Sequence, residues 1–587
     1  MNARPADRLA IAVAQLDPVV GDVAGNADKA RAARAQAARD GADLVVFPEM
    51  FICGYPPEDL VLKPALQAVC RAKVEELARE TADGGPALLI GTPWAEDGKL
   101  HNAVALLDGG RIAAVRFKVN LPNYGVFDER RVFASGPVPG PVSFRGVRLG
   151  VPVCEDIWTE WGEYEDVVGC LAETGAELLV VPNGSPYWRD KDEVRLNVAV
   201  ARVTESGLPI IFVNEMGGQD ELVFDGASFG LHADHTPAFQ LAAFREQIAV
   251  TRWERAGNTW RCIDGPFARL DDVEKDDYSA CLLGLRDYVE KNGFKGVVLG
   301  LSGGIDSALV AALAVDALGP ERVWCVMLPY RFTSEESLQD ASRLAKALGV
   351  RYDILPVERA VTGLEETLAP LFAALPRNEA EENLQARARG TVLMALSNKF
   401  GLMVVTTGNK SEMSVGYATL YGDMNGGFNP IKDLYKTEVY RLARLRNEWR
   451  PEIGLGPAGA VIPENIITRA PTAELREDQT DQDTLPPYDV LDAILERLVE
   501  REQPIAEIVA AGFERETVSK IERMLNLAEY KRRQAAPGVK VTLRNFGRDR
   551  RYPITNRFRD PGTPLPEPDR SLLQGGGASS KSEAFDF

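Results

Sequence analysis

Three side chains that could work together in covalent catalysis directly follow three apolar runs in the first half of the sequence. They are Glu49, Lys118 and Cys154. A thiolate can attack a carboxamide carbonyl while a carboxylate takes the thiol proton and an ammonium stabilises the oxyanion. Each residue also has a purely structural interpretation, as a strand-capping glutamate, a surface lysine and a buried cysteine. Their positions at strand ends, where α/β folds gather functional side chains, favour one shared cleft.

A glycine-rich loop in the second half could bind a phosphate. The sequence GLSGGIDS at 300–307 follows an apolar run and precedes an apolar helical stretch. A strand, a glycine-rich loop and a helix N-terminus together form an anion site from backbone N–H groups. The loop lacks the lysine of the motif G-x-x-x-x-G-K-S/T, so it does not indicate the β- and γ-phosphate clamp of the NTPases. A plain tight turn is the alternative interpretation.

Both groups of residues need an α/β framework to position them. Short apolar runs alternate with helical stretches in residues 8–250, and a second alternation starts at 296. The predicted strands are 9–15, 43–47, 87–90, 112–117, 149–153, 178–181 and 210–213, then 296–300, 323–328, 352–355 and 403–406. The stretch 252–272 is charged and irregular, which predicts a linker before a helix that begins at Asp277.

The length of the chain suggests two to four domains of ~150 residues each. The change of pattern predicts domains at 1–255 and 277–560, a linker at 256–276 and a tail at 561–587. Pro, Gly, Ser and charged residues dominate the tail, and such a composition buries too little apolar surface to fold, so we expect the tail to be disordered.

Composition argues against several classes of function. The chain has 67 basic and 86 acidic residues, a net charge of −19, which disfavours binding to nucleic acid and to anionic membranes. We find no run of ~18 apolar residues for a membrane span and no secretory segment at the start. The seven cysteines are scattered, so we expect a reduced, cytoplasmic protein. Only three histidines are present, which leaves acid–base chemistry to carboxylates, lysine and cysteine.

The segments around the three candidate catalytic residues resemble the nitrilase superfamily, and within it the glutaminases. These segments are FPEMFICGYPPEDL (47–60), KVNLPNYGVFDERRVF (118–133) and VPVCEDIW (151–158). The resemblance implies that Glu49, Lys118 and Cys154 form a catalytic triad, and that roughly residues 1–255 fold as an α-β-β-α sandwich. It also implies glutamine contacts, at Tyr124, Ser185 and Lys191. One departure is Pro152, because a proline inside a strand removes a ladder hydrogen bond.

The loop SGGIDS resembles the pyrophosphate-loop motif of the ATP pyrophosphatases, which cleave ATP between its α and β phosphates and adenylate a carboxylate or carbonyl oxygen. Four further segments resemble the NAD⁺ synthetases, at 382–390, 406–440, 471–489 and 531–558. Together with the glutaminase half, residues 8–558 resemble the glutamine-dependent NAD⁺ synthetase family. The resemblance implies a Rossmann-like parallel-sheet ATP-pyrophosphatase domain, with glutamine, ATP and deamido-NAD⁺ as substrates.

The same resemblance assigns binding residues in the second half. ATP contacts are implied at Gly300, Leu301, Ser302, Gly303, Gly304, Ile305, Asp306, Ser307 and Thr407. Deamido-NAD⁺ contacts are implied at Asn383, Glu412 and Lys531. The carboxylates of Asp306 and Glu412 also suit Mg²⁺ that bridges pyrophosphate oxygens. Asp306 alternatively fits a helix cap, and Glu412 a solvated loop carboxylate. We expect three further residues to line this cleft, Lys432, Asp433 and Lys436.

The implied reaction joins the two halves. Glutamine is hydrolysed through a Cys154 thioester, ATP adenylates the nicotinate carboxylate with release of diphosphate, and ammonia displaces AMP. Because water protonates free ammonia, we expect a protected passage between the domains. The synthetase halves of this family form pairs, which predicts at least a dimer.

Two other functions remain as alternatives. One is a glutamine-dependent ATP-pyrophosphatase amidotransferase with a different acceptor, but most of those use an N-terminal cysteine or a Cys-His-Glu triad. This chain starts Met1-Asn2-Ala3 and has few histidines. The other is a regulatory nucleotide-binding module with a decayed nitrilase fold. Such a module is expected to lose catalytic residues, whereas all of them are present here.

Overall fold

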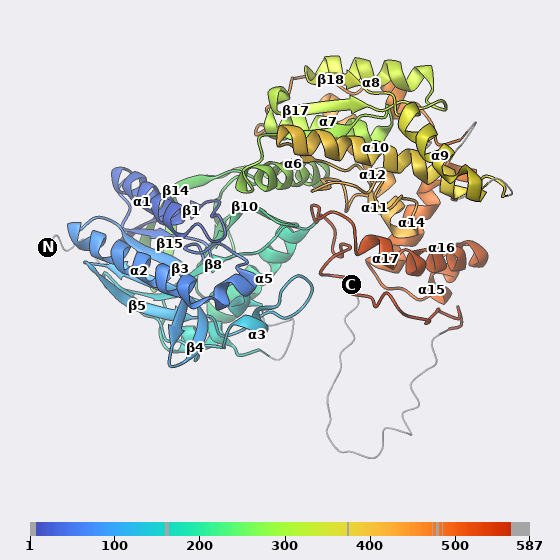
Figure 1. The fold of residues 1–587 in the computed structure, drawn as a ribbon. Coiled ribbons are helices and arrows are strands. Elements are labelled where there is room, and N and C mark those ends of the chain that lie inside the picture. The colour runs from blue at the N-terminus through green and yellow to red at the C-terminus, as the bar shows by residue number, and fades with distance from the viewer. Residues whose placement is uncertain are drawn as a thin grey trace.

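The computed structural model describes most of the chain (Figure 1). The described ranges are 7–158, 164–372, 375–471, 474–476, 481–483 and 485–564. The N-terminal part, blue to teal in Figure 1, lies beside the C-terminal part, green to red, and helix α6 (Val273–Lys291) lies between them. The tail predicted at 561–587 lies outside the described residues from 565 onward.

Two sheets form the centre of the N-terminal part. The first has the order β15-β14-β1-β2-β3-β4-β5, and the second has the order β13-β12-β9-β8-β7-β6. The strands of the first sheet are β1 (Arg8–Gln15), β2 (Leu44–Val46), β3 (Ala87–Glu96), β4 (Lys99–Asp108), β5 (Arg111–Phe117), β14 (Gln247–Ala256) and β15 (Thr259–Asp264). Those of the second are β6 (Val142–Phe144), β7 (Val147–Gly150), β8 (Leu178–Asn183), β9 (Ile210–Asn214), β12 (Phe229–Leu231) and β13 (Pro237–Gln240). A separate hairpin joins β10 (Met216–Gln219) to β11 (Leu222–Asp225).

The layers follow from the alternation of side chains along the strands. Alternate residues of β1, such as Ile11 and Val13, pack against the second sheet, while Ala12 and Ala14 face the other way. Helices cover both outer faces. They are α1 (Val23–Arg39) and α2 (Pro64–Glu80) on the first sheet, and α4 (Val167–Glu173) and α5 (Lys191–Ser206) on the second. The short helix α3 (Glu129–Val132) lies between β5 and β6 in the chain. The result is the predicted α-β-β-α sandwich.

The C-terminal part contains a parallel sheet in the order β18-β17-β16-β19. Its strands are β16 (Val297–Gly300), β17 (Val323–Met327), β18 (Arg351–Ile354) and β19 (Met403–Val404). One face packs on α6, α7 (Ile305–Leu318), α8 (Glu335–Leu348) and α12 (Lys436–Glu448). The other packs on α9 (Glu358–Phe372) and α10 (Glu379–Phe400). Because α7 is apolar on nearly every side, it is buried along almost its whole length.

A group of short helices completes the C-terminal part, at the lower right of Figure 1. They are α11 (Lys410–Val415), α14 (Tyr488–Val499), α15 (Ile505–Ala510), α16 (Arg515–Leu527) and α17 (Glu529–Arg532). Helix α13 (Glu464–Thr468) instead packs against α7 and α12 in the core on one face of the parallel sheet. Helices α14, α15 and α16 share a small apolar core of their own. Helices on both faces of a parallel sheet confirm the predicted α/β class.

The structure contains several strands that the sequence did not predict, β4 among them, and it differs from the expected boundaries in three further places. The predicted linker contains a regular strand, since β15 pairs with β14 in the first sheet. Helix α6 begins at Val273 rather than at Asp277. Strand β7 ends at Gly150, so Pro152 lies beyond it and interrupts no ladder. The charged side chains of β15 made its sequence look irregular. They are compatible with a strand because β15 lies at the edge of the sheet, where one face is exposed to water.

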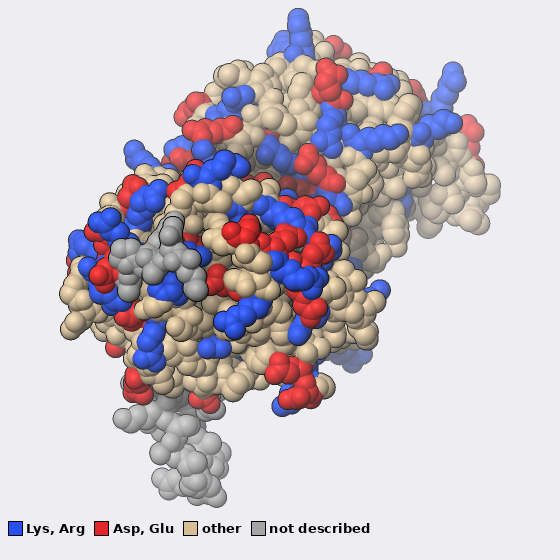
Figure 2. All heavy atoms as spheres, turned by 90° about the vertical axis from the view of Figure 1, so that its left-hand side faces the viewer, with Lys and Arg blue, Asp and Glu red and all other residues tan. Residues whose placement is uncertain are grey.

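Acidic and basic side chains are interspersed on the face of the N-terminal part that Figure 2 shows. Arg31, for example, lies within hydrogen-bonding distance of Asp28, Glu76 and Glu80. No helix among the described residues combines the length and the apolar character that crossing a membrane requires. All seven cysteines are free, and Cys170 alone is partly exposed.

Candidate active sites

The three predicted catalytic residues come together in the N-terminal part from both sheets. Glu49 follows β2, Lys118 follows β5, and Cys154 begins a short 3-10 helix (Cys154–Ile157) after β7. Lys118 Nζ lies 2.8 Å from Glu49 Oε1, and both side chains are 0% exposed. The charges of Glu49 and Lys118 both act on the Cys154 thiol. Full burial excludes the interpretation of Lys118 as a surface lysine.

The Glu49 carboxylate is fixed in orientation by donors on both oxygens. Besides Lys118, Oε1 accepts a hydrogen bond from Asn102 Nδ2 at 2.6 Å. Oε2 accepts one from the backbone N–H of Gly184 at 3.0 Å. The turn that carries Glu49 packs closely against β3, where a Cβ on Gly91 would lie 2.2 Å from the Met50 nitrogen. Glycine at 91 therefore allows this turn to approach the sheet.

Cys154 lies on a strained turn that is tied to the segment behind Lys118. Its φ is +43°, a conformation that residues with a side chain rarely adopt. The Asp156 carboxylate accepts hydrogen bonds from the backbone N–H groups of Val153, Val119 and Asn120, at 2.8–3.0 Å. Burial raises the pKa of the Cys154 thiol well above its usual value, and Glu49 adds to the increase. The resting cysteine is therefore protonated, and its attack requires a base.

The sequence analysis missed a second carboxylate in this cluster. Lys118 Nζ lies 2.8 Å from Glu129 Oε1, and Tyr55 donates its hydroxyl hydrogen to the same oxygen at 2.8 Å. Burial raises the pKa of Glu129 to about 7, with a further increase from Glu49. Glu129 belongs to the same quoted segment as Lys118, 118–133, and this was the available signal in the sequence. Asn102 lies on β4, a strand that the sequence did not predict.

Tyr124 and Glu155 form one wall near the cysteine. The Tyr124 hydroxyl donates to Glu155 Oε1 at 3.0 Å. Burial raises the pKa of Glu155 to about 7, against the attraction of Lys118. A carboxyl group that directly follows the predicted nucleophile, and whose pKa lies near neutral pH, suits recognition of a cationic ligand group.

Ser185 and Lys191 lie at the two ends of the loop between β8 and α5. Ser185 is buried, and its Oγ accepts a hydrogen bond from Arg195 Nε at 3.1 Å. Lys191 begins α5, and its Nζ lies 4.1 Å from the ring centre of Trp158. Burial lowers the pKa of Lys191 to about 7, and Arg195 lowers it further. Glu155 and Cys154 act on Lys191 in the opposite direction and raise its pKa, so their charges lie near this end of the loop.

The C-terminal part contains a cavity of about 310 Å³ at the carboxyl ends of β16 and β17. In α/β folds, ligands bind at this edge of the sheet. Its lining includes the whole predicted loop and two further predicted residues, namely Gly300, Leu301, Ser302, Gly303, Gly304, Ile305, Asp306, Ser307, Thr407 and Glu412. The structure thus brings together all the predicted ATP contacts and one of the predicted deamido-NAD⁺ contacts.

The glycine-rich loop is shaped by close packing and by its own hydroxyl groups. Gly303 has φ +83°, and a Cβ there would lie 2.5 Å from the backbone oxygen of Ser337. Ser302 Oγ accepts a hydrogen bond from the Gly304 N–H at 3.2 Å and lies 3.0 Å from Ser307 Oγ. The loop therefore leads tightly into the N-terminus of α7, where backbone N–H groups and the helix dipole favour an anion.

Two carboxylates in the cavity are bridged by one lysine. Lys436 Nζ lies 2.5 Å from Asp306 Oδ2 and 3.0 Å from Glu412 Oε1. Asn409 Nδ2 donates to the other oxygen of Asp306 at 2.8 Å. Burial raises the pKa of Glu412 to about 7, with a further increase from Asp306. Asp306 does not cap α7, because the N-cap is Gly304 and no side chain caps this helix end, and Glu412 is a largely buried residue of α11 and not a solvated loop residue.

The carboxylate pair fits Mg²⁺, which proteins usually hold through one or two carboxylates and the phosphates of a substrate. The side chains of Asp306 and Glu412 offer hard oxygen ligands beside the phosphate loop. Among the described residues, no group of three or more His, Cys, Asp or Glu side chains could hold a metal ion. A metal here would therefore depend on phosphate oxygens for part of its coordination.

Asn383 and Lys531 are not among the residues that line this cavity. Asn383 Oδ1 accepts a hydrogen bond from Thr419 Oγ1 at 2.7 Å. Lys531 Nζ donates to the backbone oxygens of Gly416 and Ala418 at 2.8 and 2.7 Å. Ala418 itself lines the cavity, so Lys531 supports part of its wall, whereas Thr419, the partner of Asn383, is not a lining residue.

Two of the three other residues expected in the cleft lie elsewhere. Lys436 lines the cavity, but Lys432 and Asp433 do not. Lys432 Nζ lies 3.4 Å from Glu221 of the N-terminal part, and Asp433 lies 2.8 Å from Lys410. The sequence analysis also missed Arg469, which lines the cavity and donates to Ser337 Oγ at 2.9 Å. Its segment lies beyond the quoted motifs, so no local signal pointed to it.

The comparisons with known proteins divide the chain in the same way. The carbon-nitrogen hydrolase family model matches residues 10–256, and the NAD synthase model matches residues 278–535. A curated glutamine-dependent NAD(+) synthetase from Rhodobacter capsulatus is 53% identical over 94% of this chain and 99% of that protein. One from Xanthomonas campestris pv. campestris is 48% identical over 95% of this chain and 99% of that protein.

A solved structure is similar over nearly the same length. The glutamine-dependent NAD+ synthetase from Acinetobacter baumannii, in complex with adenosine diphosphate, is 41% identical and has a TM-score of 0.74. The match covers 94% of this chain and 99% of that chain. The two halves of this chain therefore occur together, in the same order, in the relatives.

Proposed function

This chain belongs to the glutamine-dependent NAD(+) synthetase family, and we propose which of its residues carry each step of the reaction. The enzyme amidates deamido-NAD⁺ to NAD⁺ with ammonia released from glutamine. ATP drives the reaction through an adenylated intermediate, and the other products are AMP, diphosphate and glutamate. The relatives confirm this predicted activity and argue against an amidotransferase with a different acceptor or a regulatory module.

The proposed glutaminase step uses Cys154 as the nucleophile and Glu49 as its base. Glu49 takes the thiol proton, Cys154 Sγ attacks the amide carbon of glutamine, and Lys118 stabilises the oxyanion. Glu49 then gives the proton to the leaving ammonia, and water hydrolyses the thioester to glutamate. The buried Glu49–Lys118 pair, whose charges act on the Cys154 thiol, is the observation that supports these roles.

We assign glutamine binding to the loop ends and to the tyrosine that face the cysteine. The residues are Tyr124, Ser185 and Lys191. Tyr124 and Glu155 suit the α-amino group, because a carboxylate next to a hydroxyl attracts an ammonium. Lys191 suits the α-carboxylate, and binding of that anion would restore the lysine pKa that burial has lowered.

The proposed synthetase step places ATP on the loop 300–307 and Thr407, at the N-terminus of α7. Asp306 and Glu412 would hold Mg²⁺, which when bound shields the charge of the pyrophosphate group. Asn383, Glu412 and Lys531 are the proposed contacts for deamido-NAD⁺. Of these three, Glu412 has the stronger support, because it lines the cavity and Asn383 and Lys531 do not.

We propose a division into two domains that meet along α6. The glutaminase domain extends through β15 to Asp264, and the synthetase domain begins with α6 at Val273. A protected passage for ammonia is part of this proposal. So is a reduced, cytoplasmic location, because the reaction needs the free thiol of Cys154.

We also propose that the enzyme is at least a dimer, through the outer face of the synthetase domain. Leu364, Leu371 and Leu375, on and just beyond α9, are 41%, 76% and 66% exposed. In Figure 1, α9 lies at the edge of the molecule farthest from the glutaminase domain. Exposed apolar side chains that lie close together favour contact with another protein. The mass of the protein in solution tests this proposal.

The substitution Cys154→Ala tests the division of labour between the two sites. We expect it to abolish NAD⁺ formation from glutamine, because only the thiol releases ammonia. Formation from added ammonium should stay within about twofold of wild type, since the phosphate cavity is untouched. The measurement is the initial rate of NAD⁺ formation with each nitrogen donor. A folded variant that loses both activities would contradict the assignment of Cys154.

A further inference from the structure

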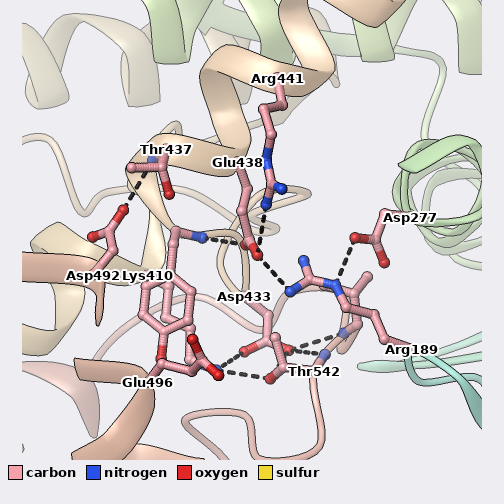
Figure 3. Close-up of polar contacts among 12 residues, drawn as sticks. Arg189, Asp277, Lys410, Asp433, Thr437, Glu438, Arg441, Asp492, Glu496 and Thr542 are labelled. Atoms are coloured by element: carbon pink, nitrogen blue, oxygen red, sulfur yellow. Dashed lines mark hydrogen bonds and ion pairs between the residues drawn. The ribbon is translucent and has the colours of Figure 1, made fainter. Parts of the chain in front are cut away.

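The loop that carries Ser185 and Lys191 is held by the synthetase domain through one arginine between them. Arg189 belongs to the glutaminase domain, but its side chain points across the domain boundary (Figure 3). Its Nε lies 2.7 Å from Asp277 Oδ2 of α6. Its Nη1 lies 2.5 Å from Glu438 Oε1 of α12. One guanidinium therefore joins this loop to two helices of the other domain.

Two more contacts hold the same loop against the synthetase domain. The backbone N–H of Arg189 donates to the Val541 oxygen at 3.0 Å. The Tyr187 hydroxyl donates to Asp277 Oδ1 at 3.0 Å, so both oxygens of this carboxylate bind the loop. These partners lie in different segments of the synthetase domain. The conformation of the loop between Ser185 and Lys191 thus depends on the position of that domain.

The ion pairs around Arg189 are only slightly exposed. The side chains of Asp277 and Glu438 are 6% and 10% exposed, and that of Arg189 is 21% exposed. Burial alone lowers the pKa of Arg189, but the attraction of the two carboxylates outweighs it and raises the pKa. Charged hydrogen bonds that are shielded from water are strong and directional, so they are suited to hold a loop in one conformation.

Helix α12, on the synthetase side of Arg189, is also fixed at its N-terminus. Glu438 Oε2 accepts a hydrogen bond from the Tyr435 N–H at 2.8 Å and so caps the helix. Lys436, the first residue of α12, bridges Asp306 and Glu412 in the phosphate cavity. Arg189 therefore joins the loop from Ser185 to Lys191, called the glutamine loop below, to the first turn of α12, which carries Lys436.

We propose that Arg189 is a positioning residue for glutamine, through which α6 and α12 of the synthetase domain hold the glutamine loop in its binding conformation. The inference rests on the proposed roles of Ser185 and Lys191. On this view the glutaminase pocket is complete only when the synthetase domain is docked. The Arg189 side chain forms its ion pairs with Asp277 and Glu438 and not with Cys154, so its loss should act on glutamine binding and alignment and not on the chemistry of the synthetase site.

The test compares Arg189→Met and Arg189→Lys with wild type in the full-length enzyme. Steady-state NAD⁺ formation is measured over a range of glutamine and, separately, of ammonium concentrations. Because a misplacement of about 1 Å can cost about a hundredfold, we expect kcat/KM for glutamine to fall between about tenfold and a hundredfold in Arg189→Met. The rise in KM should account for most of the loss. Arg189→Lys keeps one ion pair and should lie between Arg189→Met and wild type.

Arg441→Met is the matched control. Arg441 Nη2 lies 3.5 Å from the same Glu438 oxygen, but its side chain is 54% exposed and contacts no residue of the loop. We expect this variant to keep the wild-type KM for glutamine. A second test is the pair Arg189→Met and Glu438→Gln, whose combined effect should be smaller than the sum of the two single effects.

Three outcomes would overturn the inference. They are an unchanged KM for glutamine in Arg189→Met, an equal loss with ammonium, and the same loss in Arg441→Met. An equal loss with ammonium would show a general defect of folding and not a misplaced loop. The Cys154→Ala result separates this inference from the proposed function. If that variant loses only the glutamine-dependent activity while Arg189→Met behaves like wild type, the triad stands and the positioning role fails.

Discussion

At the scale of single residues, the glutaminase site contains one lysine between two buried carboxyl groups. Lys118 Nζ lies 2.8 Å from both Glu49 and Glu129. The residue types and their positions after strands made Glu49, Lys118 and Cys154 candidates, and the resemblance of the surrounding segments to the nitrilase superfamily implied that they form a triad. Glu129 and Asn102 could not be predicted, because their importance comes from side chains that meet only after the sheets have packed. A carboxyl group with a pKa of about 7 in this cluster should affect stability near neutral pH.

The pH dependence of stability follows from the raised pKa of Glu129. Its ordinary value is 4.5, and burial raises it to about 7, so the folded protein holds this proton more tightly than the unfolded chain. The resulting stabilisation is complete below about pH 4.5 and is lost as the pH rises through 7. For one group it amounts to at most about 3 kcal/mol.

Glu129→Gln should therefore flatten the fall in thermal stability between about pH 5 and 8, because the amide keeps its hydrogen-bond partners without the titration. The midpoint of thermal unfolding is measured across this range. Glu75→Gln, at a side chain that is 44% exposed, is the control and should leave the slope unchanged. Part of the fall in thermal stability with pH should remain in both variants, because Glu155 and Glu412 also have pKa values raised to about 7. Equal slopes in wild type and Glu129→Gln would contradict this role.

At the scale of elements, the sites lie where strands end and helices begin. Continuous apolar runs made the central strands predictable, and β1, β8, β9 and β17 lie close to their predicted ranges. Strands such as β15 were missed because edge strands carry charged residues that resemble a loop. The loop 300–307 was predicted because its glycines and serines lie directly between a strand and a helix. Its shape should depend most on Gly303, where space and backbone conformation are both restricted.

Gly303→Ala should disable the synthetase site with either nitrogen donor. A Cβ there would lie 2.5 Å from the backbone oxygen of Ser337, and φ is +83°. We expect a loss of about a hundredfold in NAD⁺ formation, because the loop must move from the N-terminus of α7. Gly293→Ala is the matched control, since Gly293 also has a positive φ, +71°, but a Cβ meets nothing within 4 Å. It should cost only about 1 kcal/mol of stability and leave activity unchanged. Similar kinetics in both variants would show that packing at Gly303 is not critical.

At the scale of the whole molecule, the two active sites lie on domains that contact each other along much of the chain. Lys291 lies 2.6 Å from Asp17, Arg189 bridges to α6 and α12, and Arg548 pairs with Glu58. Arg189 and Glu438 are 249 positions apart, so no local pattern could have predicted their contact. Resemblance to known families predicted both domains, but only the structure shows how one supports the other. We propose that ammonia passes between the two sites along this interface.

Transfer through an enclosed path predicts that the amide nitrogen of glutamine reaches NAD⁺ in preference to free ammonium. Ammonia released into water at neutral pH is mostly protonated and no longer nucleophilic, whereas an enclosed path keeps it neutral. The test supplies glutamine labelled with ¹⁵N at the amide together with a modest excess of unlabelled ammonium, and mass spectrometry measures the label in the product amide. We expect the label to exceed its share of the free pool severalfold. Cys154→Ala with labelled ammonium is the control, and its product should match the pool. If wild-type NAD⁺ also matches the pool, the nitrogen passes through solvent, and the contact between the domains serves only to hold the glutamine loop.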